Sequence, residues 1–439
     1  MVPHLTTALT GPIHELEARI LESMPAIERW FRLEWMEHTP PFYCSVDLRN
    51  AGFKLAPVDT NLFPSDFNNL TPEMLPLAVQ AAMAAIEKIC PEAKNLLLIP
   101  DRDNRNSFYL SNVQRLIRVF TQAGLNVRLG ALDEAVTTPT ALALPDGGEL
   151  VLEPLQRKRG RLGLKDFDPC TILLNDDLSA GVPKVLQHLY EQYLLPPLHA
   201  GWALRRKSRH LQSYEEVAKK FAKLLGMDAW LINPMYHLCG PVNLDDAPEL
   251  DGLQTQVDAL LNKVRRKYKE YGINEKPFVV VKADNGGAGL RTITVRDAKD
   301  LIETIKRARG ALGTRGIGTE AEAGLGGSVA DIILQEGVVT KERVNDAVAE
   351  PVVYMIDRYV VGGFYRVHAE LGVDEYLNAP GASFVPLAFA QSHRLPKPGD
   401  KPGASAPNRF YMYGVIGRLA MLAASYELEA TDPDADVYD

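Results

Sequence analysis

The chain has few cysteines, and no two of them stand close together in the sequence. Cys44, Cys90, Cys170 and Cys239 are the only four among 439 residues, and no CxxC pair occurs. This spacing disfavours a disulfide scaffold and a cysteine-based zinc site, and it favours a reducing compartment. We therefore expect a cytoplasmic protein.

Long apolar runs are also missing. No run approaches the roughly 18 residues that a membrane helix needs. The first residues, Met1 to Gly11, lack the basic stretch and apolar segment that are typical of a signal peptide. The sequence thus predicts a soluble protein without a membrane partner.

Positive charge is not in excess. Lys and Arg number 48 and Asp and Glu number 56, so the net charge is −8. Phosphate affinity needs a concentrated positive surface, so this balance disfavours a nucleic-acid partner. One basic cluster, Arg157 to Arg161, has no interleaved aromatic residues for base stacking, and we interpret it as a solvated loop.

Several motifs of well-known enzyme classes are absent. The chain contains no GxxxxGK[ST], no HExxH and no GxSxG, and internal repeats are not evident. The nine histidines are scattered, and His368 within an expected hairpin is best interpreted as structural. Nucleophilic catalysis through Cys or Ser therefore has no local support.

Apolar patterning in the first half alternates between the periods of helices and strands. At roughly 150 residues per domain, the length predicts about two or three domains or one large α/β enzyme. Strands separated by helices indicate a parallel sheet. The expected helices are Thr71 to Ile89 and Ser107 to Ala123, and the expected strands are Asn95 to Pro100, Leu125 to Leu129 and Thr171 to Leu174.

The second half of the sequence shows a different pattern. We expect a glycine turn at Gly362-Gly363 inside a β-hairpin, and two glycine- or proline-rich loops, 309–328 and 395–406, as candidate lids. The expected helices are Ser213 to Leu225, Leu253 to Tyr271, Arg296 to Ala308 and Tyr413 to Leu428, and the expected strands are Phe278 to Lys282, Asp331 to Glu336, Val352 to Val361 and Phe364 to Glu370.

A strand delivers a lysine into a glycine-rich turn in this half. Lys282 ends the apolar run and is followed by Gly286, Gly287 and Gly289, whose backbone N–H groups can approach anionic oxygens closely. The β-branched run Thr292 to Val295 then favours a second strand rather than a helix, so we expect an antiparallel flap. A glycine hairpin with an incidental lysine is the alternative.

The residues around this flap resemble those of the ATP-grasp enzymes in their order along the chain. That superfamily places ATP between two α/β subdomains, with two lysines, a glycine flap, an adenine-hinge strand and magnesium ligands. The resemblance covers roughly residues 200–390. It implies ATP contacts at Lys207, Lys282, Gly286, Gly287, Gly289, Gln335, Glu336, Val338 and Glu350, and a phosphate contact at Arg366.

Two polar segments in the first half add to this picture. Asp59 and Asn61 are two positions apart, so in a strand both side chains point the same way, and their oxygens suit Mg²⁺. A solvated turn is the alternative interpretation. The segment Asp101 to Ser107 directly follows an expected strand, and ligands of α/β sheets bind at such carboxyl ends.

Both segments resemble eukaryotic-type glutathione synthetase, in Asp59-Thr60-Asn61 with Ser65-Asp66-Phe67 and in Arg105-Asn106-Ser107-Phe108. Over its full length the chain most resembles a bacterial family of glutamate–cysteine ligases. That resemblance also rests on Lys282 to Gly287 and on Asn378 to Ser383. It implies ATP and Mg²⁺ as cofactors, metal ligands at Asp59, Asn61 and, as a candidate, Asp284, and substrate contacts at Arg49, Asn104, Asn106, Arg366 and Asn378.

The implied fold is α/β, an ATP-grasp of the glutathione synthetase-like kind. Residues 1–200 would form an N-terminal α/β region with a parallel sheet and the substrate loops, and residues 201–439 the ATP-grasp region. The implied reaction joins the γ-carboxylate of L-glutamate to the amine of L-cysteine through an acyl phosphate, with Lys282 and Arg366 as catalytic residues. A homodimer is implied by analogy. The alternatives are another ATP-grasp ligase, such as a glutathione synthetase or an amino-acid ligase, and a non-catalytic nucleotide-binding protein.

Overall fold

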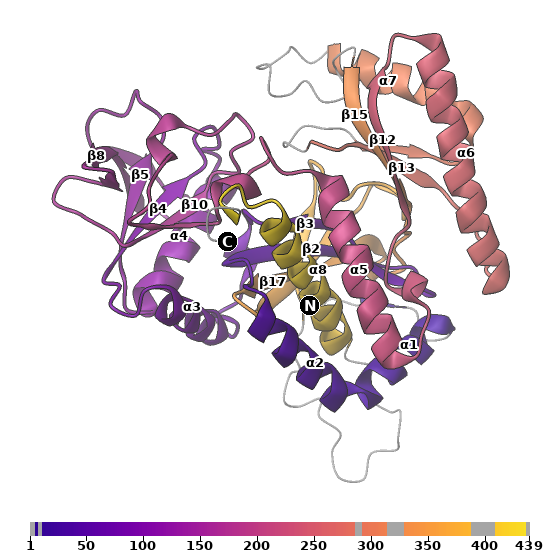
Figure 1. Cartoon of the computed structure of the whole chain (residues 1–439), viewed down its shortest axis with the longest axis horizontal. Helices are drawn as coiled ribbons and strands as arrows, with labels where there is room; N and C mark the ends of the chain where they lie inside the picture. Colours follow the sequence, from indigo (N-terminus) through magenta and orange to yellow (C-terminus); the bar gives the residue numbers. More distant parts are fainter. Residues whose placement is uncertain (1–4, 8–10, 286–291, 314–328, 388–408, 436–439) are drawn as a thin grey trace.

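Three large β-sheets organise the protein, which is a mixed α/β fold (Figure 1). The computed structural model describes residues 5–7, 11–285, 292–313, 329–387 and 409–435. Within these ranges, no helix is long and apolar enough to span a membrane.

The first sheet contains six strands in the order β11-β10-β4-β5-β7-β6, and all neighbours are parallel except β6 and β7. The predicted parallel sheet is therefore confirmed, and β4 has the bounds that the sequence predicts. Helix α4 connects β4 to β5, and with α3 it packs its apolar side against the sheet. The elements are β4 (Asn95–Pro100), β5 (Asn126–Ala131), β6 (Thr140–Ala143), β7 (Glu149–Pro154), β10 (Thr171–Asn175), β11 (Tyr193–Leu195), α3 (Leu75–Ile89) and α4 (Ser107–Gln122).

The central sheet contains seven antiparallel strands, and β17 pairs with β2, β16 and β18. Helices α1, α2, α5 and α8 contribute to the core on one face, and α3 and α4 contribute to the core on the other. The elements are β1 (Leu5–Thr6), β2 (Tyr43–Asn50), β3 (Leu55–Asn61), β16 (Arg343–Val344), β17 (Ala347–Ile356), β18 (Tyr359–His368), β19 (Ser383–Pro386), α1 (Pro12–Glu22), α2 (Met24–Glu37), α5 (Lys207–Leu225) and α8 (Phe410–Ala430).

The smaller sheet has the order β12-β15-β13-β14, with all neighbours antiparallel. Alternate residues such as Val279 and Val281 are buried against α6 and α7. Lys282, which directly follows Val281, belongs to the opposite face, and this alternation directs its side chain away from the core. The elements are β12 (Tyr236–Asn243), β13 (Val279–Ala283), β14 (Ile293–Val295), β15 (Val329–Glu336), α6 (Ala247–Glu270) and α7 (Leu301–Gly313).

The predicted glycine turn of the hairpin is wrong. Gly362 and Gly363 lie inside β18, opposite Tyr354 and Val353, and the turn falls at Asp357, whose φ is 50°. Close packing explains the two glycines, since a β-carbon on Gly363 would lie 2.5 Å from a side-chain carbon of Leu387. A glycine pair thus marks a tight contact here rather than a reversal.

Other predicted boundaries shift by a few residues. Helix α5 begins at Lys207 rather than Ser213, and α7 extends to Gly313, into the first expected lid loop. The remainder of that loop (314–328) and the second (395–406) lie outside the described residues. The central sheet takes β2 and β3 from the first half and β16 to β19 from the second, so the strands of the two predicted regions interleave.

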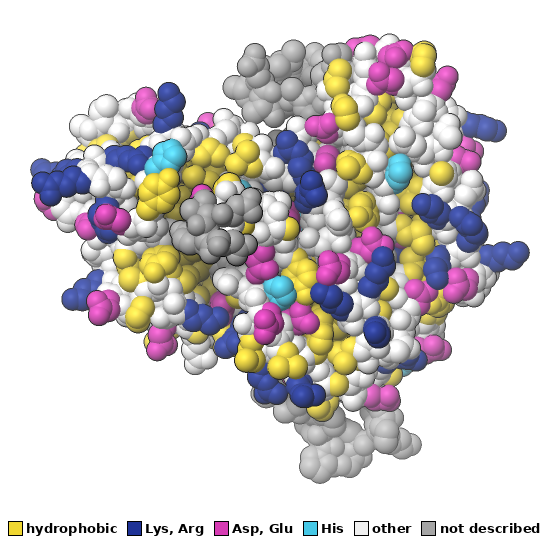
Figure 2. Space-filling model, in the orientation of Figure 1, with side chains coloured by type: hydrophobic (Ala, Val, Ile, Leu, Met, Phe, Trp, Pro, Cys, Tyr) yellow, Lys and Arg dark blue, Asp and Glu magenta, His cyan; other side chains and the backbone are white. Residues whose placement is uncertain are grey.

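The basic cluster forms a small hairpin instead of an irregular loop. Strands β8 (Gln156–Lys158) and β9 (Arg161–Gly163) pair antiparallel around Arg159 and Gly160. The side chains of Lys158 and Arg159 are exposed, as the sequence predicts, and Figure 2 shows basic side chains gathered at this edge of the molecule.

Candidate active site

Lys207 and Lys282 come from distant parts of the sequence and line the same pocket as Asp59. Lys207 begins α5, Lys282 lies on β13 and Asp59 lies on β3. The pocket therefore opens between the central sheet, the smaller sheet and α5, and its enclosed volume is about 30 Å³. The other lining residues are Pro57, Val58, Thr60, Trp202, Arg205, His210, Leu211, Tyr214 and Gln335.

The two ammonium groups are held in ways that leave them receptive to an anion. Nζ of Lys282 donates to the carbonyl oxygen of Val58 (3.0 Å), and Nζ of Lys207 lies 4.7 Å from the centre of the Trp202 ring. Burial lowers the pKa of Lys282 to about 8, although the nearby Asp59 acts in the opposite direction. Burial also lowers the pKa of Lys207. An anionic ligand would favour the charged form of both side chains.

The amino end of α5, and with it Lys207, is fixed by Asp284. The backbone N–H of Lys207 donates to the carbonyl oxygen of Asp284 (2.9 Å). The backbone N–H and hydroxyl of Ser208 donate to the two carboxylate oxygens, at 2.6 and 2.7 Å. Asp284 thus acts as an N-terminal cap supplied by another segment. Its metal-ligand role stays a prediction, while these contacts favour a structural one.

A buried cluster of opposite charges lies on the central sheet. Arg366 on β18 is paired with Glu350 on β17, and its Nη1 donates to Glu350 Oε1 (2.8 Å) and to Asp47 Oδ2 (2.5 Å). Its Nη2 lies 3.9 Å from Asp66. Burial raises the pKa of Asp47 to about 7 and raises the pKa of Asp66. Arg366 is therefore surrounded by three carboxylates, two of which resist ionisation.

Arg49 is held by the same cluster from the other side. Its Nε donates to Glu350 Oε2 (2.9 Å), its Nη1 donates to the carbonyl oxygen of Val338 (3.2 Å), and its Nη2 donates to the carbonyl oxygen of Glu375. These contacts connect β2 to the segment after β15 and to the segment after β18. The structure thus places Glu350 between two arginines, where it orients both of them.

The candidate metal ligands Asp59 and Asn61 lie on one strand, as expected. The strand register places Asp59 opposite Asp47 on β2. Asp59 Oδ1 accepts from the N–H of Thr60 (3.0 Å), and Asn61 Oδ1 accepts from the N–H of Phe63 (2.9 Å). Among the described residues, no group of three His, Cys, Asp or Glu side chains is arranged to hold a metal.

The predicted hinge residues end β15. Gln335 faces the pocket, and its Nε2 is buried without a hydrogen-bond partner in the described part of the chain. The carboxylate of Glu336 points elsewhere and accepts from Lys54 Nζ (2.8 Å) and from Trp230 Nε1 (3.0 Å). The Glu336 side chain therefore stabilises the end of β15 from the side away from the pocket. Of the two hinge side chains, Gln335 is the one that lines the pocket.

The predicted substrate loop follows β4. Asn106 Oδ1 accepts from the backbone N–H of Tyr109 (2.8 Å) and so caps α4, while its amide donates to Asn104 Oδ1 (2.7 Å). The ring of Phe108 stacks on Phe384, with centroids 5.1 Å apart. Phe384 is the strand partner of Arg366, so the loop reaches the central sheet beside the charge cluster.

Asn378 lies in the segment between β18 and β19. Its side chain is exposed, and its amide lies 3.4 Å from the hydroxyl of Tyr376. Nη2 of Arg49 donates to the carbonyl oxygen of Glu375, and this contact places the segment beside the charge cluster. The predicted flap residues Gly286, Gly287 and Gly289 lie outside the described residues.

The residues that sequence reasoning missed are Asp47, Trp202, Arg205 and His210. Asp47 alternates with Arg49 on β2, and this charged alternation in a strand was the available signal. The others stand just before or within the first turns of α5, whose start the sequence did not reveal.

Comparisons with known proteins agree with one another. The model of the glutamate-cysteine ligase family (GshA) matches residues 17–428. A Methylobacillus flagellatus crystal structure assigned as a gamma-glutamylcysteine synthetase is 52% identical, with a TM-score of 0.84, and the match covers 98% of this chain and 100% of that chain.

Two more remote structures also match. A glutathione synthetase-like effector of Globodera pallida is 12% identical (TM-score 0.38, 86% of this chain and 83% of that one). D-alanyl-alanine synthetase A of Vibrio cholerae is 11% identical (TM-score 0.32, 77% and 80%). No curated protein matches. The chain belongs to the glutamate-cysteine ligase family and is a ligase that joins glutamate to cysteine.

Proposed function

We propose that the ligase uses ATP to activate the γ-carboxylate of L-glutamate as an acyl phosphate, which the amine of L-cysteine then attacks. The observation that supports this most is the convergence of Lys207, Lys282 and Asp59 on one pocket. Two partly buried ammonium groups suit the oxygens of a polyphosphate, and a lysine binds them as a compact cation. The placement of this pocket between two sheets is also what an ATP-grasp arrangement requires.

The protein's contribution to such chemistry is positioning and charge stabilisation. Lys207 and Lys282 would bind phosphate oxygens, and the capped start of α5 fixes one of them in place. Gln335 would meet the base from β15, since its buried amide is without a partner in the described residues. The Glu336 N–H already donates to the carbonyl oxygen of Met235, and the Val338 carbonyl already accepts from Arg49. The carbonyl oxygen of Glu336 and the N–H of Val338, at and just after the end of that strand, would therefore bind the adenine edge.

Magnesium fits this site through Asp59. Mg²⁺ is usually bound by one or two carboxylates together with substrate phosphates and water, and Asp59 offers a carboxylate to the pocket that holds the two lysines. Asn61 and Asp284 use every side-chain oxygen that they have within the protein, whereas in the described residues Asp59 uses only Oδ1, for the N–H of Thr60. Asp59 is therefore the residue we assign first. When bound, the metal would supply charge to the phosphate oxygens.

Arg366 is the proposed partner of the acyl phosphate or of a substrate carboxylate. Its guanidinium is engaged by Asp47 and Glu350. Because burial raises the pKa of Asp47 to about 7, this carboxylate gives up its charge more readily than an exposed one. An anionic substrate oxygen can then replace it on the guanidinium. Arg49, Asn104, Asn106 and Asn378 are the remaining candidates for substrate contacts.

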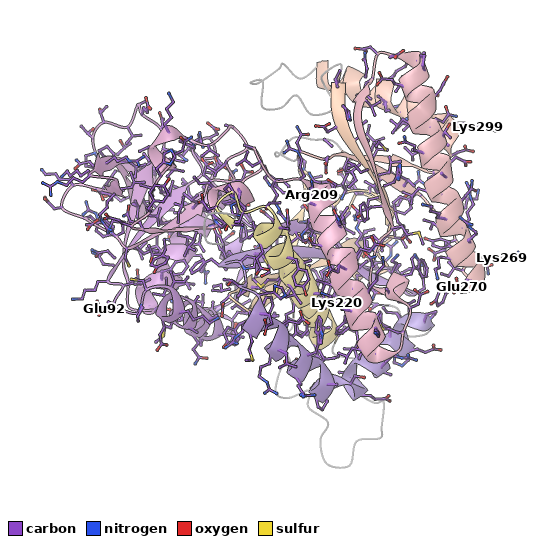
Figure 3. The ribbon with its side chains drawn as sticks, viewed as in Figure 1. Glu92, Arg209, Lys220, Lys269, Glu270 and Lys299 are labelled. Atoms are coloured by element: carbon purple, nitrogen blue, oxygen red, sulfur yellow. The ribbon has the colours of Figure 1, made fainter. Side chains whose placement is uncertain are left out.

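Phosphate release with glutamate, cysteine, ATP and Mg²⁺ tests this proposal. Lys282→Ala should abolish phosphate release. Lys299→Ala should leave it unchanged, since Lys299 is an exposed lysine between β14 and α7 (Figure 3). Cysteine should accelerate release only when glutamate is present. Normal turnover by a folded Lys282→Ala protein would refute the assignment of the pocket. Binding of ATP without any ADP formation would indicate a non-catalytic nucleotide-binding protein.

A further inference from the structure

A chain of hydrogen bonds ends on a histidine that the reaction described so far does not use. Nδ1 of His210 lies 3.0 Å from Oε2 of Glu427 on α8. Arg205 holds the same carboxylate through Nε (2.8 Å) and Nη2 (2.9 Å), and its Nη1 donates to the carbonyl oxygen of Thr60 (2.8 Å). The histidine is thus tied to β3 next to Asp59.

His210 faces the pocket of the two lysines. It stands three positions after Lys207, so both side chains project from the same side of α5. It lines the pocket together with Asp59 and Lys282, and its side chain is 10% exposed. The charged groups at this pocket are Arg205 and Lys207 before and at the start of α5, Asp59 on β3 and Lys282 on β13, with Glu427 behind the ring.

The hydrogen bond to Glu427 determines which ring nitrogen is available. A carboxylate partner favours the tautomer with the proton on Nδ1 and fixes the orientation of the ring. The pairing with Arg205 and His210 outweighs burial and lowers the pKa of Glu427 to about 2, so the carboxylate stays charged. In the described part of the chain the only ring nitrogen of His210 with a hydrogen-bond partner is Nδ1, so the lone pair of Nε2 stays available on a residue that lines the pocket.

The ligase reaction needs such a group. The α-amine of an amino acid is mostly protonated at neutral pH and cannot attack a carbonyl in that form. We propose that His210 is the general base that takes a proton from the ammonium group of the incoming cysteine. This inference rests on the proposed acyl phosphate.

Two protons leave the ammonium nitrogen during the proposed reaction. Nε2 of His210 accepts one ammonium proton, and the freed lone pair on nitrogen attacks the γ-carbonyl carbon. The C–N bond forms. The bond between the γ-carbon and the oxygen that it shares with phosphorus breaks, and its electron pair remains on the phosphate. The departing phosphate accepts a second proton from the nitrogen, which leaves the neutral amide. The imidazolium returns its proton to water before the next turnover.

Hydroxylamine separates this role from a structural one, because it is largely unprotonated at neutral pH and attacks acyl phosphates without a base. His210→Gln should lose about 100-fold or more of its turnover with cysteine, the range of general-base removal. Its formation of γ-glutamyl hydroxamate from glutamate, ATP and hydroxylamine should be little changed. Arg209→Gln is the matched control, since Arg209 directly precedes His210 and is exposed at the amino end of α5 (Figure 3).

Other results of these assays would refute either the role of His210 or the acyl phosphate. Equal losses with cysteine and hydroxylamine, or a raised KM for ATP alone, would show that His210 supports the fold or the nucleotide and would refute its role as a base. Absence of hydroxamate with the wild-type enzyme would instead refute the acyl phosphate. If His210→Gln does not fold, Glu427→Gln provides the second variant. It keeps the imidazole but loses the charged partner, so it should lower turnover with cysteine selectively, and an unselective loss would refute the proposal.

Discussion

Asp284 provides a sharp test because its sequence context and its contacts predict different roles. As a metal ligand it would determine the magnesium requirement, whereas as a cap it determines the stability of α5 and the position of Lys207. Asp284→Ala removes the cap, and Asp284→Asn keeps an oxygen that can accept from the N–H of Ser208. The amide of that asparagine can also donate to the hydroxyl of Ser208.

The contacts of Asp284 determine how much stability its substitution should cost. The carboxylate accepts two hydrogen bonds, at 2.6 and 2.7 Å, at a helix N-terminus and at a position that is 5% exposed. A hydrogen bond to a charged group contributes about 1.5–3 kcal/mol, and losing an N-cap costs about 0.5–2 kcal/mol. Because the two contributions overlap, we expect Asp284→Ala to lower the free energy of unfolding by about 2–4 kcal/mol. Asp284→Asn should lose about 1 kcal/mol, through the helix dipole.

Urea unfolding and the magnesium dependence of turnover distinguish the two roles. The cap predicts a destabilised Asp284→Ala protein and an Asp284→Asn enzyme with the wild-type magnesium requirement. A free energy of unfolding for Asp284→Ala within about 0.5 kcal/mol of wild type would refute the capping role. A magnesium requirement raised more than about 100-fold in Asp284→Asn, beyond the range of losing an outer-shell partner, would support direct ligation instead.

Three further predictions concern substitutions at single positions. Because burial lowers the pKa of Lys282 to about 8, its ammonium is lost as pH rises through that value. ATP affinity measured by calorimetry should then fall above pH 8 in wild type but stay level in Lys282→Arg. Gly363→Ala should destabilise by about 1–3 kcal/mol because the new carbon would overlap its neighbours, whereas Gly252→Ala on α6 has open space and should stabilise by up to about 1 kcal/mol in thermal unfolding. Lys54→Met should cost about 3–5 kcal/mol by leaving the buried carboxylate of Glu336 uncompensated, and a double variant with Glu336→Gln that recovered none of this loss would contradict the pairing.

Local sequence patterns predicted the helices and strands that depend only on neighbouring residues. The strand Asn95–Pro100 and the helix after it were predictable because an apolar run and an apolar helical face identify them without reference to any distant residue. The start of α5 was not, because Asp284 caps it from 76 positions away. Gly362 was interpreted as a turn because the side chain that requires a small residue there, Leu70, comes from a remote segment.

Part of the candidate site was also predictable from the sequence. Lys207, Lys282 and Asp59 were found from their motifs, and the structure brings them to one pocket, although their roles stay proposals. His210 was not found, since its significance depends on Glu427, which follows it by 217 positions. Side chains that act through long-range hydrogen bonds carry no local signal.

Transfer of oxygen from glutamate to phosphate tests the central claim most directly. The γ-carboxylate of glutamate is labelled with ¹⁸O, and the phosphate released with ATP, Mg²⁺ and cysteine is examined by mass spectrometry. An acyl phosphate predicts that each released phosphate carries one oxygen from the glutamate carboxylate. Phosphate without the label, formed in step with γ-glutamylcysteine, would contradict the account.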